Sequence, residues 1–357
     1  MKIGILTFHR ADNYGAVLQC YALQTFLRQQ GHDAYVLDYR QPYLEYMYHC
    51  SVFRQILSQL KNSKKIDLER ILIKKNINSC FQSFRDKFLY VDNRKFCKYN
   101  RIPTDYDAYL IGSDQVWSYS VCGNVVDPVY WGDFCRLVKG KVISFAASSA
   151  VEKFKSWGEE DIREKLQNFN SISVREPVLK DYLQNFTDKD ITVLSDPTLL
   201  LDNDSWSVIA DSSKLQLPPK YILLYSVRDY NNYNQLVKEK AEHLSQKMEV
   251  PLIEMGRSYI YSPEDFLKLI KHATFFITSS FHGTVFANIF RINYSTIAYG
   301  DGNDARYTNL LDRLNMNHCL HGIHENVDFA NINYFDIDEK LNLFKLQAQT
   351  FVNISIK

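Results

Sequence analysis

Short apolar runs alternate with helix-length amphipathic segments along most of the chain. This alternation is typical of parallel α/β units, in which a helix follows each strand. In the helix expected after the first strand, Ala16, Cys20, Leu23 and Leu27 recur at three- and four-residue spacing, and Gly31 follows its end. The strands expected in the first half are Ile3–Phe8, Ala34–Leu37, Ala108–Ile111, Val142–Phe145, Ser171–Val174 and Ile191–Val193.

A second series of the same kind begins after a cluster of turn-forming residues, which predicts an interdomain linker near 203–219. Its expected strands are Tyr221–Val227, Leu252–Met255, Phe275–Thr278 and Ser295–Tyr299, and its expected helices lie at about 231–248, 263–272, 282–290 and 305–314. The pattern therefore predicts an α/β fold with two Rossmann-like domains that face a cleft. Their predicted bounds are 1–203, with a helical insertion at about 43–100, and 204–335, followed by a closing helix and tail at 336–357.

Composition narrows the class of protein. A net charge of +1 provides no strong field for nucleic acid. Seven cysteines form no C-x-x-C pair, and Met1-Lys2 runs directly into the first expected strand. We therefore expect a reduced, cytoplasmic protein with no metal site. The basic stretch at 59–76 is either a solvated helix face or a weak peripheral contact with anionic lipid at the inner face of the membrane.

Polar residues follow two of the strands expected in the first domain. After the first strand, Asn13 or Asp12 can cap the helix, and Asn13 with Tyr14 can hydrogen-bond and stack on a sugar; alternatively the helix is capped without touching a ligand. After the strand at 108–111, Gly112 permits a tight turn. Asp114 then projects as a candidate base beside an apolar wall, Trp117, or serves only as a helix cap or ion-pair partner.

Arg175 ends a third strand, where its guanidinium can grip a carboxylate or phosphate, or can pair with Glu176 or Asp196. The run "TSSFHGTVFANIF" places His282 at a turn from strand to helix, where backbone N–H groups and the helix dipole favour an anion. The alternative is that Ser279 or Ser280 caps the helix and His282 fills space.

A Gly-rich loop then enters another helix with Arg306 in its first turn. A cation there opposes the helix dipole, which suggests a nearby anion or simple exposure.

Six runs, in order, resemble the polysaccharide pyruvyl transferase family: "NYGAVLQCYALQ", "DAYLIGSDQVW", "SFAASSA", "ISVREP", "SDPTLLL" and "TSSFHGTVFANI". The resemblance covers residues 1 to about 315. It implies a fold similar to GT-B glycosyltransferases. It also implies transfer of pyruvate from phosphoenolpyruvate to a sugar as a cyclic ketal, in the assembly of a capsule, an exopolysaccharide or a cell-wall glycan. The acceptor would be a lipid-linked or nucleotide-linked glycan, and no cofactor would be needed.

The resemblance also implies roles for individual residues. His282 would be the acid, and Asp114 would be the base or a group that orients the acceptor, with Arg175 as a third catalytic residue. The implied donor-binding residues are Arg175, Ser279, Ser280, His282, Gly283 and Arg306. The implied acceptor-binding residues are Asn13, Tyr14, Asp114 and Trp117.

One motif departs from the family. Some members carry Arg-Leu-His where this chain has Ser280-Phe281-His282. Either Arg306 or Arg228 replaces that arginine, or the donor binds differently. Two other functions fit the same architecture. One is a sugar-nucleotide glycosyltransferase, and the other is a non-catalytic carbohydrate-binding protein.

Overall fold

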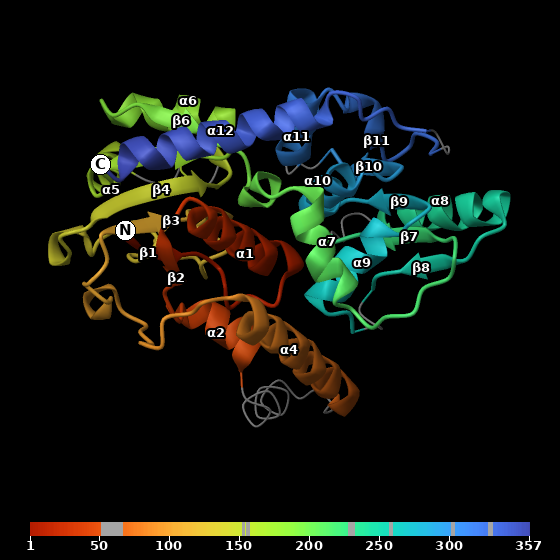
Figure 1. Cartoon of the computed structure of the whole chain (residues 1–357), viewed down its shortest axis with the longest axis horizontal. Coiled ribbons are helices and arrows are strands. Elements are labelled where there is room, and N and C mark those ends of the chain that lie inside the picture. The colour runs from red at the N-terminus through yellow and green to blue at the C-terminus, as the bar shows by residue number, and fades with distance from the viewer. Residues whose placement is uncertain are drawn as a thin grey trace. The chain divides into compact units, whose positions relative to one another are not determined.

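The computed structural model divides into two compact units (Figure 1). Unit 1 comprises Met1–Leu200 and Phe344–Lys357, and unit 2 comprises Leu201–Leu343. The structure describes residues 1–50, 67–151, 154, 158–227, 233–256, 260–300, 304–327 and 331–357. The basic stretch at 59–76 lies partly outside these residues, and Arg228 lies wholly outside them.

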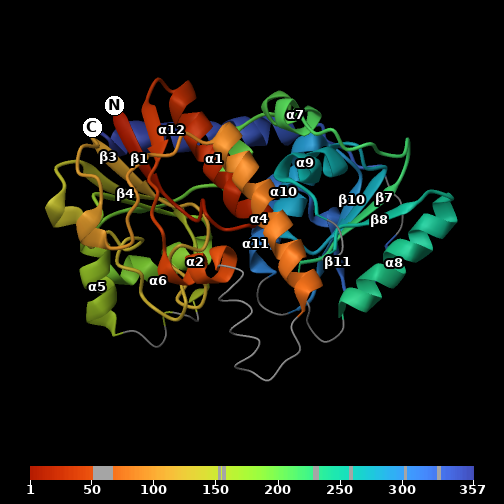
Figure 2. The same ribbon diagram turned by 90° about the horizontal axis from the view of Figure 1, so that it is seen from below.

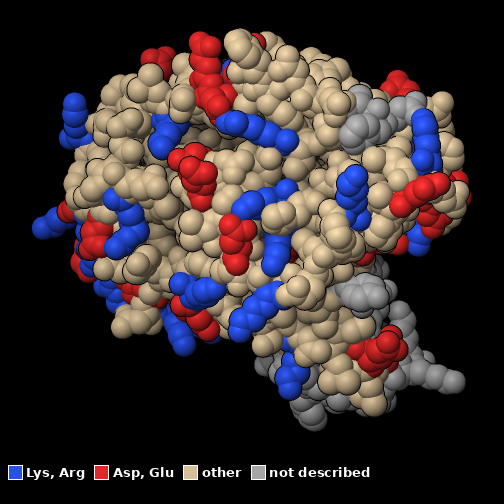
Figure 3. Space-filling view, turned by 45° about the vertical axis from the view of Figure 1, so that its right-hand side comes forward, with Lys and Arg blue, Asp and Glu red and all other residues tan. Residues whose placement is uncertain are grey.

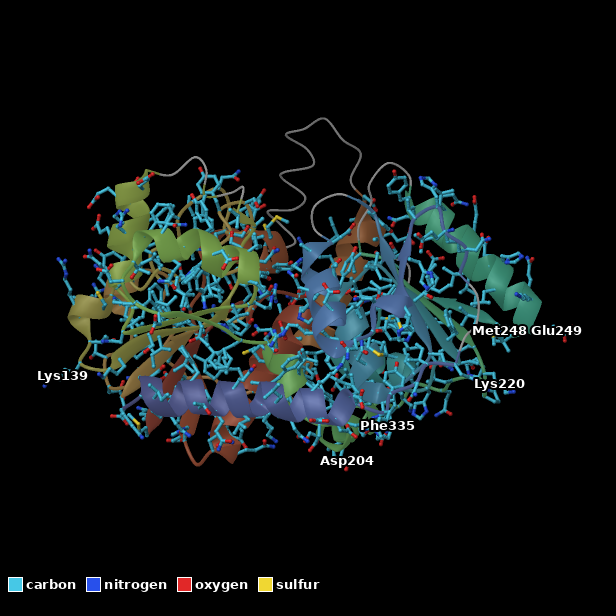
Figure 4. The ribbon with its side chains drawn as sticks, turned by 90° about the horizontal axis from the view of Figure 1, so that it is seen from above. Lys139, Asp204, Lys220, Met248, Glu249 and Phe335 are labelled. Atoms are coloured by element: carbon cyan, nitrogen blue, oxygen red, sulfur yellow. The ribbon has the colours of Figure 1, made fainter. Side chains whose placement is uncertain are left out.

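Unit 1 is built on a six-stranded parallel sheet with the strand order β2-β1-β3-β4-β5-β6. Its strands are β1 (Lys2–Leu6), β2 (Asp33–Val36), β3 (Ala108–Ile111), β4 (Lys141–Ala147), β5 (Ser171–Val174) and β6 (Ile191–Val193). Lys139 lies in the turn that enters β4 (Figure 4). The helices of unit 1 are α1 (Tyr14–Gln29), α2 (Pro42–His49), α4 (Leu68–Phe88), α5 (Glu159–Gln167) and α6 (Pro177–Leu183).

Both faces of this sheet are covered. On one face, Ile3, Leu110 and Phe145 pack with side chains of α1 and with Phe351 and Val352 of α12 (Ile337–Ser355). The other face packs against α5, α6 and an aromatic-rich segment between β3 and β4. Strands that are buried on both sides need continuous apolar runs, which is why β3 reads Ala-Tyr-Leu-Ile with every residue buried.

Unit 2 has a five-stranded parallel sheet with the order β11-β10-β9-β7-β8. Its strands are β7 (Ile222–Tyr225), β8 (Leu252–Glu254), β9 (Phe275–Thr278), β10 (Tyr294–Ala298) and β11 (Leu320–Gly322). Apart from the start of α12, the helices of unit 2 are α7 (Asn203–Asp211), α8 (Tyr233–Met248), α9 (Pro263–Lys271), α10 (Phe281–Phe290) and α11 (Ala305–Leu314). Figure 2 shows α8 on one side of the sheet and α9 and α10 on the other.

The fold class predicted from the sequence, α/β with two Rossmann-like domains, is confirmed by these two parallel sheets with helices on both faces. The strands predicted at 108–111, 171–174, 191–193 and 275–278 coincide with β3, β5, β6 and β9. The short strand β11 was not predicted.

The linker predicted at 203–219 is wrong over its first half, because residues 203–211 form α7. Asp202 caps this helix by accepting a hydrogen bond from the Ser205 N–H at 2.8 Å, and Trp206, Ile209 and Ala210 form its buried face. The Asp, Asn and Ser residues that suggest a turn are here the cap and the first turn of a helix.

The surface fits the near-zero net charge. Figure 3 shows acidic and basic side chains interspersed over the visible face. None of the helices in the described parts of the chain combines the length and the apolar composition that crossing a bilayer requires.

Gly112 offers a direct test of the turn after β3. Its φ is +122°, and a Cβ atom would lie 2.2 Å from the Phe145 carbonyl oxygen. We expect Gly112→Ala to lower the free energy of unfolding by roughly 2–4 kcal/mol, through backbone strain and this clash. Gly31→Ala is the matched control, because φ is +83° there but no atom lies within 4 Å. It should cost about 1 kcal/mol. Equal losses in urea unfolding would contradict the role of the clash.

Candidate functional site

Each sheet reverses its strand order at one point. In unit 1, β1 connects to β2 on one side and β3 lies on its other side. In unit 2, β7 connects to β8 on one side and β9 lies on the other. Ligands of open parallel sheets bind at the carboxyl ends of the strands that flank such a point. A ligand site is therefore expected at the loops after β1 and β3 and at those after β7 and β9.

In unit 1, the loops after β1 and β3 are tied together by buried hydrogen bonds. The Thr7 hydroxyl donates to the Ser113 carbonyl oxygen at 3.1 Å, and the Gln19 amide donates to the Thr7 hydroxyl at 2.7 Å. Ser113 in turn donates to the Ala146 carbonyl oxygen at 2.8 Å, which joins the loop after β4. Three loops thus form one supported edge.

Asp114 lies on that edge with φ at +72°, in the left-handed region that an aspartate seldom adopts. Its carbonyl oxygen accepts a hydrogen bond from the Ser148 N–H at 3.0 Å, and its Oδ1 accepts one from the Gln115 N–H at 2.8 Å. Ala146 on the neighbouring loop also has positive φ, +47°. Conformations of this kind persist where the surroundings fix them, and they often accompany functional sites. The half-buried carboxylate of Asp114 is therefore held in one direction.

Arg175 is buried, with 6% of its surface exposed, and its nitrogens contact protein groups. Nε donates to Glu176 Oε1, Nη1 to Asp196 Oδ2 and Nη2 to Ser148 Oγ, each at 2.9 Å. Burial by itself lowers the pKa of Arg175, but the carboxylates of Glu176, Asp196 and Asp114 outweigh burial and raise it. The structure therefore brings Arg175 and Asp114 together, and it shows the ion pairs that the sequence left as an alternative.

The predicted acceptor residues differ in exposure. Asn13 is exposed and caps α1 by accepting a hydrogen bond from the Ala16 N–H at 3.1 Å. The ring of Tyr14 lies 5.2 Å from that of Phe81 on α4. Trp117 is 2% exposed and stacks on Trp131 at 4.5 Å, so its indole belongs to the core. Its role as a wall for a sugar stays a prediction, which this packing does not favour.

A buried charge cluster beside this edge was not predicted from the sequence. His9 Nδ1 lies 3.2 Å from the Thr7 carbonyl oxygen, and its Nε2 lies 3.5 Å from Asp38 Oδ1. Burial lowers the pKa of His9, and Asp38 only partly offsets this. Burial also raises the pKa of Asp38, but contacts with His9 and Arg40 outweigh it and lower the pKa to about 2.

Charged residues of the same loop, next to His9, attach the two helices of the insertion. Arg10 pairs with Glu45 of α2, and Arg85 of α4 pairs with Asp12 at 3.1 Å. Burial raises the pKa of Tyr48, also on α2, and the nearby carboxylates of Asp12 and Asp114 raise it further. α2 and α4 therefore lie over the loop after β1, with Tyr48 near Asp114.

In unit 2, the turn between β9 and α10 has the geometry of a capped helix start. The Ser280 hydroxyl accepts a hydrogen bond from the Gly283 N–H at 3.2 Å. A Cβ atom on Gly283 would lie 2.5 Å from Thr278 Oγ1, so only glycine fits without movement. His282, in the first turn, is half-buried. The cap that the sequence left as an alternative is present, and it does not exclude a ligand role for His282.

Ser279 belongs to a hydroxyl cluster that the sequence did not reveal. Ser226, directly after β7, contacts Ser279 at 3.0 Å, Tyr299 after β10 at 2.8 Å and Asn234 of α8 at 2.5 Å. The available signal was that a polar residue follows each of three buried strands.

Arg306 lies in the first turn of α11, as predicted. Within the described residues, no three His, Cys, Asp or Glu side chains are placed to hold a metal ion.

Arg175 allows a test of its structural role. Arg175→Ala leaves two buried carboxylates unpaired, so we expect it to lower the free energy of unfolding by about 3–5 kcal/mol. Arg101→Ala, at an exposed position of the same unit, should change it by less than about 0.5 kcal/mol. If Arg175→Ala left urea unfolding unchanged and weakened only the binding of phosphoenolpyruvate, Arg175 would be a donor ligand and not a structural ion pair.

The lowered pKa of Asp38 predicts that the free energy of unfolding depends on pH. Because its pKa is lower in the folded protein than in the unfolded chain, its contribution is fully present above about pH 4 and is lost as the pH falls toward about 2. At pH 7, Asp38→Asn should be less stable than the original protein by roughly 2 kcal/mol. This difference should narrow between pH 4.5 and pH 3 in urea titrations. A difference that stays constant over that range would show that the charge of Asp38 does not contribute.

Comparison with known proteins adds three findings. No curated protein matches the sequence. Among solved structures, the chain is similar to UDP-GlcNAc 2-epimerase from Methanocaldococcus jannaschii, with 11% identity, a TM-score of 0.47 and coverage of 97% of this chain and 100% of that one. The same enzyme from Neisseria meningitidis, bound to UDP-GlcNAc, gives 12% identity, a TM-score of 0.44 and coverage of 97% and 100%.

The spinosyn forosaminyltransferase SpnP gives 13% identity, a TM-score of 0.39 and coverage of 99% of this chain and 94% of that one. The family model described as polysaccharide pyruvyl transferase matches residues 13–301, which begin at the cap of α1 and include the loops after β3, β7 and β9. The chain therefore belongs to the polysaccharide pyruvyl transferase family.

Proposed function

We propose that this protein transfers pyruvate from phosphoenolpyruvate to two hydroxyl groups of one sugar, forming a cyclic ketal in the assembly of a capsule, an exopolysaccharide or a cell-wall glycan. Family membership over residues 13–301 is the observation that carries this proposal. The capped turn at His282, at the carboxyl end of a strand beside the reversal of the unit 2 sheet, supports it.

The reaction sets the groups that are required. The methylene carbon of phosphoenolpyruvate gains a proton, and C2 becomes electrophilic. One sugar hydroxyl forms a C–O bond to C2, the bond from C2 to the phosphate oxygen breaks, and the second hydroxyl closes the ring. Of the two hydroxyl protons, one balances the new methyl group and the other leaves with phosphate. The protein must supply an acid near the donor, a base near the acceptor and donors for the anionic groups.

The donor part of the proposal rests on unit 2. His282 is the proposed acid, and Ser279, Ser280 and Gly283 form the turn that would hold the donor's anionic groups. The dipole of α10 favours an anion at this end of the helix. Ser280 stands where some relatives have arginine, and it has a local role, because its hydroxyl caps α10. Arg306 is proposed as a cation that compensates for the missing arginine.

The acceptor part rests on unit 1. Asp114, fixed in direction by its backbone conformation, is the proposed base. Asn13 and Tyr14 are proposed to contact the sugar. Arg175, through Ser148 and Glu176, is proposed to set the charge near Asp114. A lipid-linked or nucleotide-linked glycan is the proposed acceptor, and we place the reaction in the cytoplasm.

The experiment is incubation with phosphoenolpyruvate and a panel of lipid-linked and nucleotide-linked sugars, with phosphate release and product mass as readouts. With an accepted sugar, His282→Asn should keep the fold and much of the donor affinity while turnover falls by roughly 10²–10⁴-fold, the usual range for a lost general acid.

His243→Asn, an exposed histidine of the same unit, is the control and should retain full turnover. Near-normal turnover of His282→Asn would leave His282 as a packing or binding residue. A melting temperature raised by a nucleotide sugar and not by phosphoenolpyruvate would favour a glycosyltransferase. Sugar binding without any turnover would favour a carbohydrate-binding protein.

A further inference from the structure

The hydroxyl cluster of unit 2 contains an amide that the described residues fix at one end only. Asn234 lies in the first turn of α8, at the opposite end from Met248 and Glu249, which Figure 4 labels. Its Oδ1 contacts the Ser226 hydroxyl at 2.5 Å and accepts a hydrogen bond from the Tyr299 hydroxyl at 3.0 Å. The distance of 2.5 Å suits an O–H···O bond and is too short for a normal N–H···O bond. The oxygen of the amide is therefore the end that faces the cluster.

The groups around this oxygen are themselves held in place. Tyr299 is 3% exposed, and its ring packs edge-on against Tyr233 at 5.5 Å. Ser226 also contacts the Ser279 hydroxyl at 3.0 Å, and Ser279 accepts a hydrogen bond from the Val227 N–H at 3.3 Å. Each partner of Asn234 is thus fixed by a buried ring or by a strand end.

The other end of the amide is open as far as the described residues show. Nδ2 of Asn234 carries two N–H donors, and it bonds to none of the residues that the structure describes. The side chain is half-buried and accessible to a ligand. An amide whose oxygen accepts two internal hydrogen bonds cannot rotate without breaking both, so the outward group can only donate. It lies beside the point where the unit 2 sheet reverses its strand order.

We propose that the amide nitrogen of Asn234 binds an oxyanion, a phosphate or carboxylate oxygen, of a ligand at the carboxyl ends of β7 and β9, and that Ser226 and Tyr299 orient it for this role. An oxyanion matches the site because it only accepts hydrogen bonds, whereas a ligand hydroxyl or amide also carries a donor, which finds no acceptor on the Asn234 nitrogen. The positive end of the α8 dipole acts in the same direction. The identity of the ligand as phosphoenolpyruvate rests on the proposed function, but the oxyanion site does not.

The test is calorimetry of the full chain with three probes: inorganic phosphate, pyruvate and phosphoenolpyruvate. Asn234→Asp keeps an oxygen for Ser226 and Tyr299 but replaces the donor with a second, charged oxygen. Affinity for the probes that use this site should fall by roughly 30-fold or more, through the lost hydrogen bond and charge repulsion. Tyr299→Phe keeps the donor but removes one orienting hydroxyl, so its loss should be smaller, about 3- to 10-fold.

Two controls make the result decisive. Gln235→Glu introduces the same charge at the next, exposed residue of α8 and should change affinity by less than about 3-fold. If Asn234→Asp fails to fold, Asn234→Ala should still weaken binding by about 10-fold. If Asn234→Asp loses affinity for phosphate only, or for pyruvate only, the result identifies which oxyanion is bound. Either result supports the site.

Three outcomes overturn the proposal: wild-type protein that binds none of the probes, a folded Asn234→Asp that binds them normally, and an equal loss in Gln235→Glu. Binding that depends on Asn234 without phosphate release from phosphoenolpyruvate would keep the oxyanion site and reject the proposed reaction.

Discussion

One buried guanidinium holds together the carboxyl ends of three neighbouring strands in unit 1. Arg175 follows β5, and it binds Ser148 after β4 and Asp196 after β6. Asp196 also accepts hydrogen bonds from the backbone and hydroxyl of Thr198, which fixes the turn after β6. Removing water from these charges is costly unless every partner is present. The position of Asp114, whose carbonyl oxygen is bonded to Ser148, therefore depends on an arginine that need not touch a substrate.

The sequence was sufficient to predict those elements of the fold that depend on a local pattern of apolar residues. Buried parallel strands are continuous apolar runs, so β3, β5, β6 and β9 could be read directly. Three-residue β11 carries too little pattern to be recognised. The start of α7 could not be distinguished from a turn, because Asp and Ser favour both. Phe335, just before the closing helix expected from residue 336, is 89% exposed although it is a large apolar residue (Figure 4).

The candidate site was predictable only in part, because its chemistry depends on pairs that are distant in sequence. Arg175 and Asp196 are 21 residues apart, and Ser226 and Tyr299 are 73 apart. The sequence indicated which residues end the strands, and the strand order then decided which of these meet. It gave no sign that Trp117 stacks on Trp131 in the core or that His9 lies beside Asp38.

The distribution of α12 between the two units has a consequence for the order of folding. Ala348, Phe351 and Val352 fill the same face of the unit 1 sheet as α1, although all of unit 2 lies between them and β6 in the sequence. During synthesis from the N-terminus, this face of β1, β3 and β4 is covered only in part, by α1, until these residues have emerged, whereas unit 2 can complete its own sheet earlier. The first sheet to begin is therefore the last to close, and a nascent chain must keep that apolar surface from aggregating in the meantime.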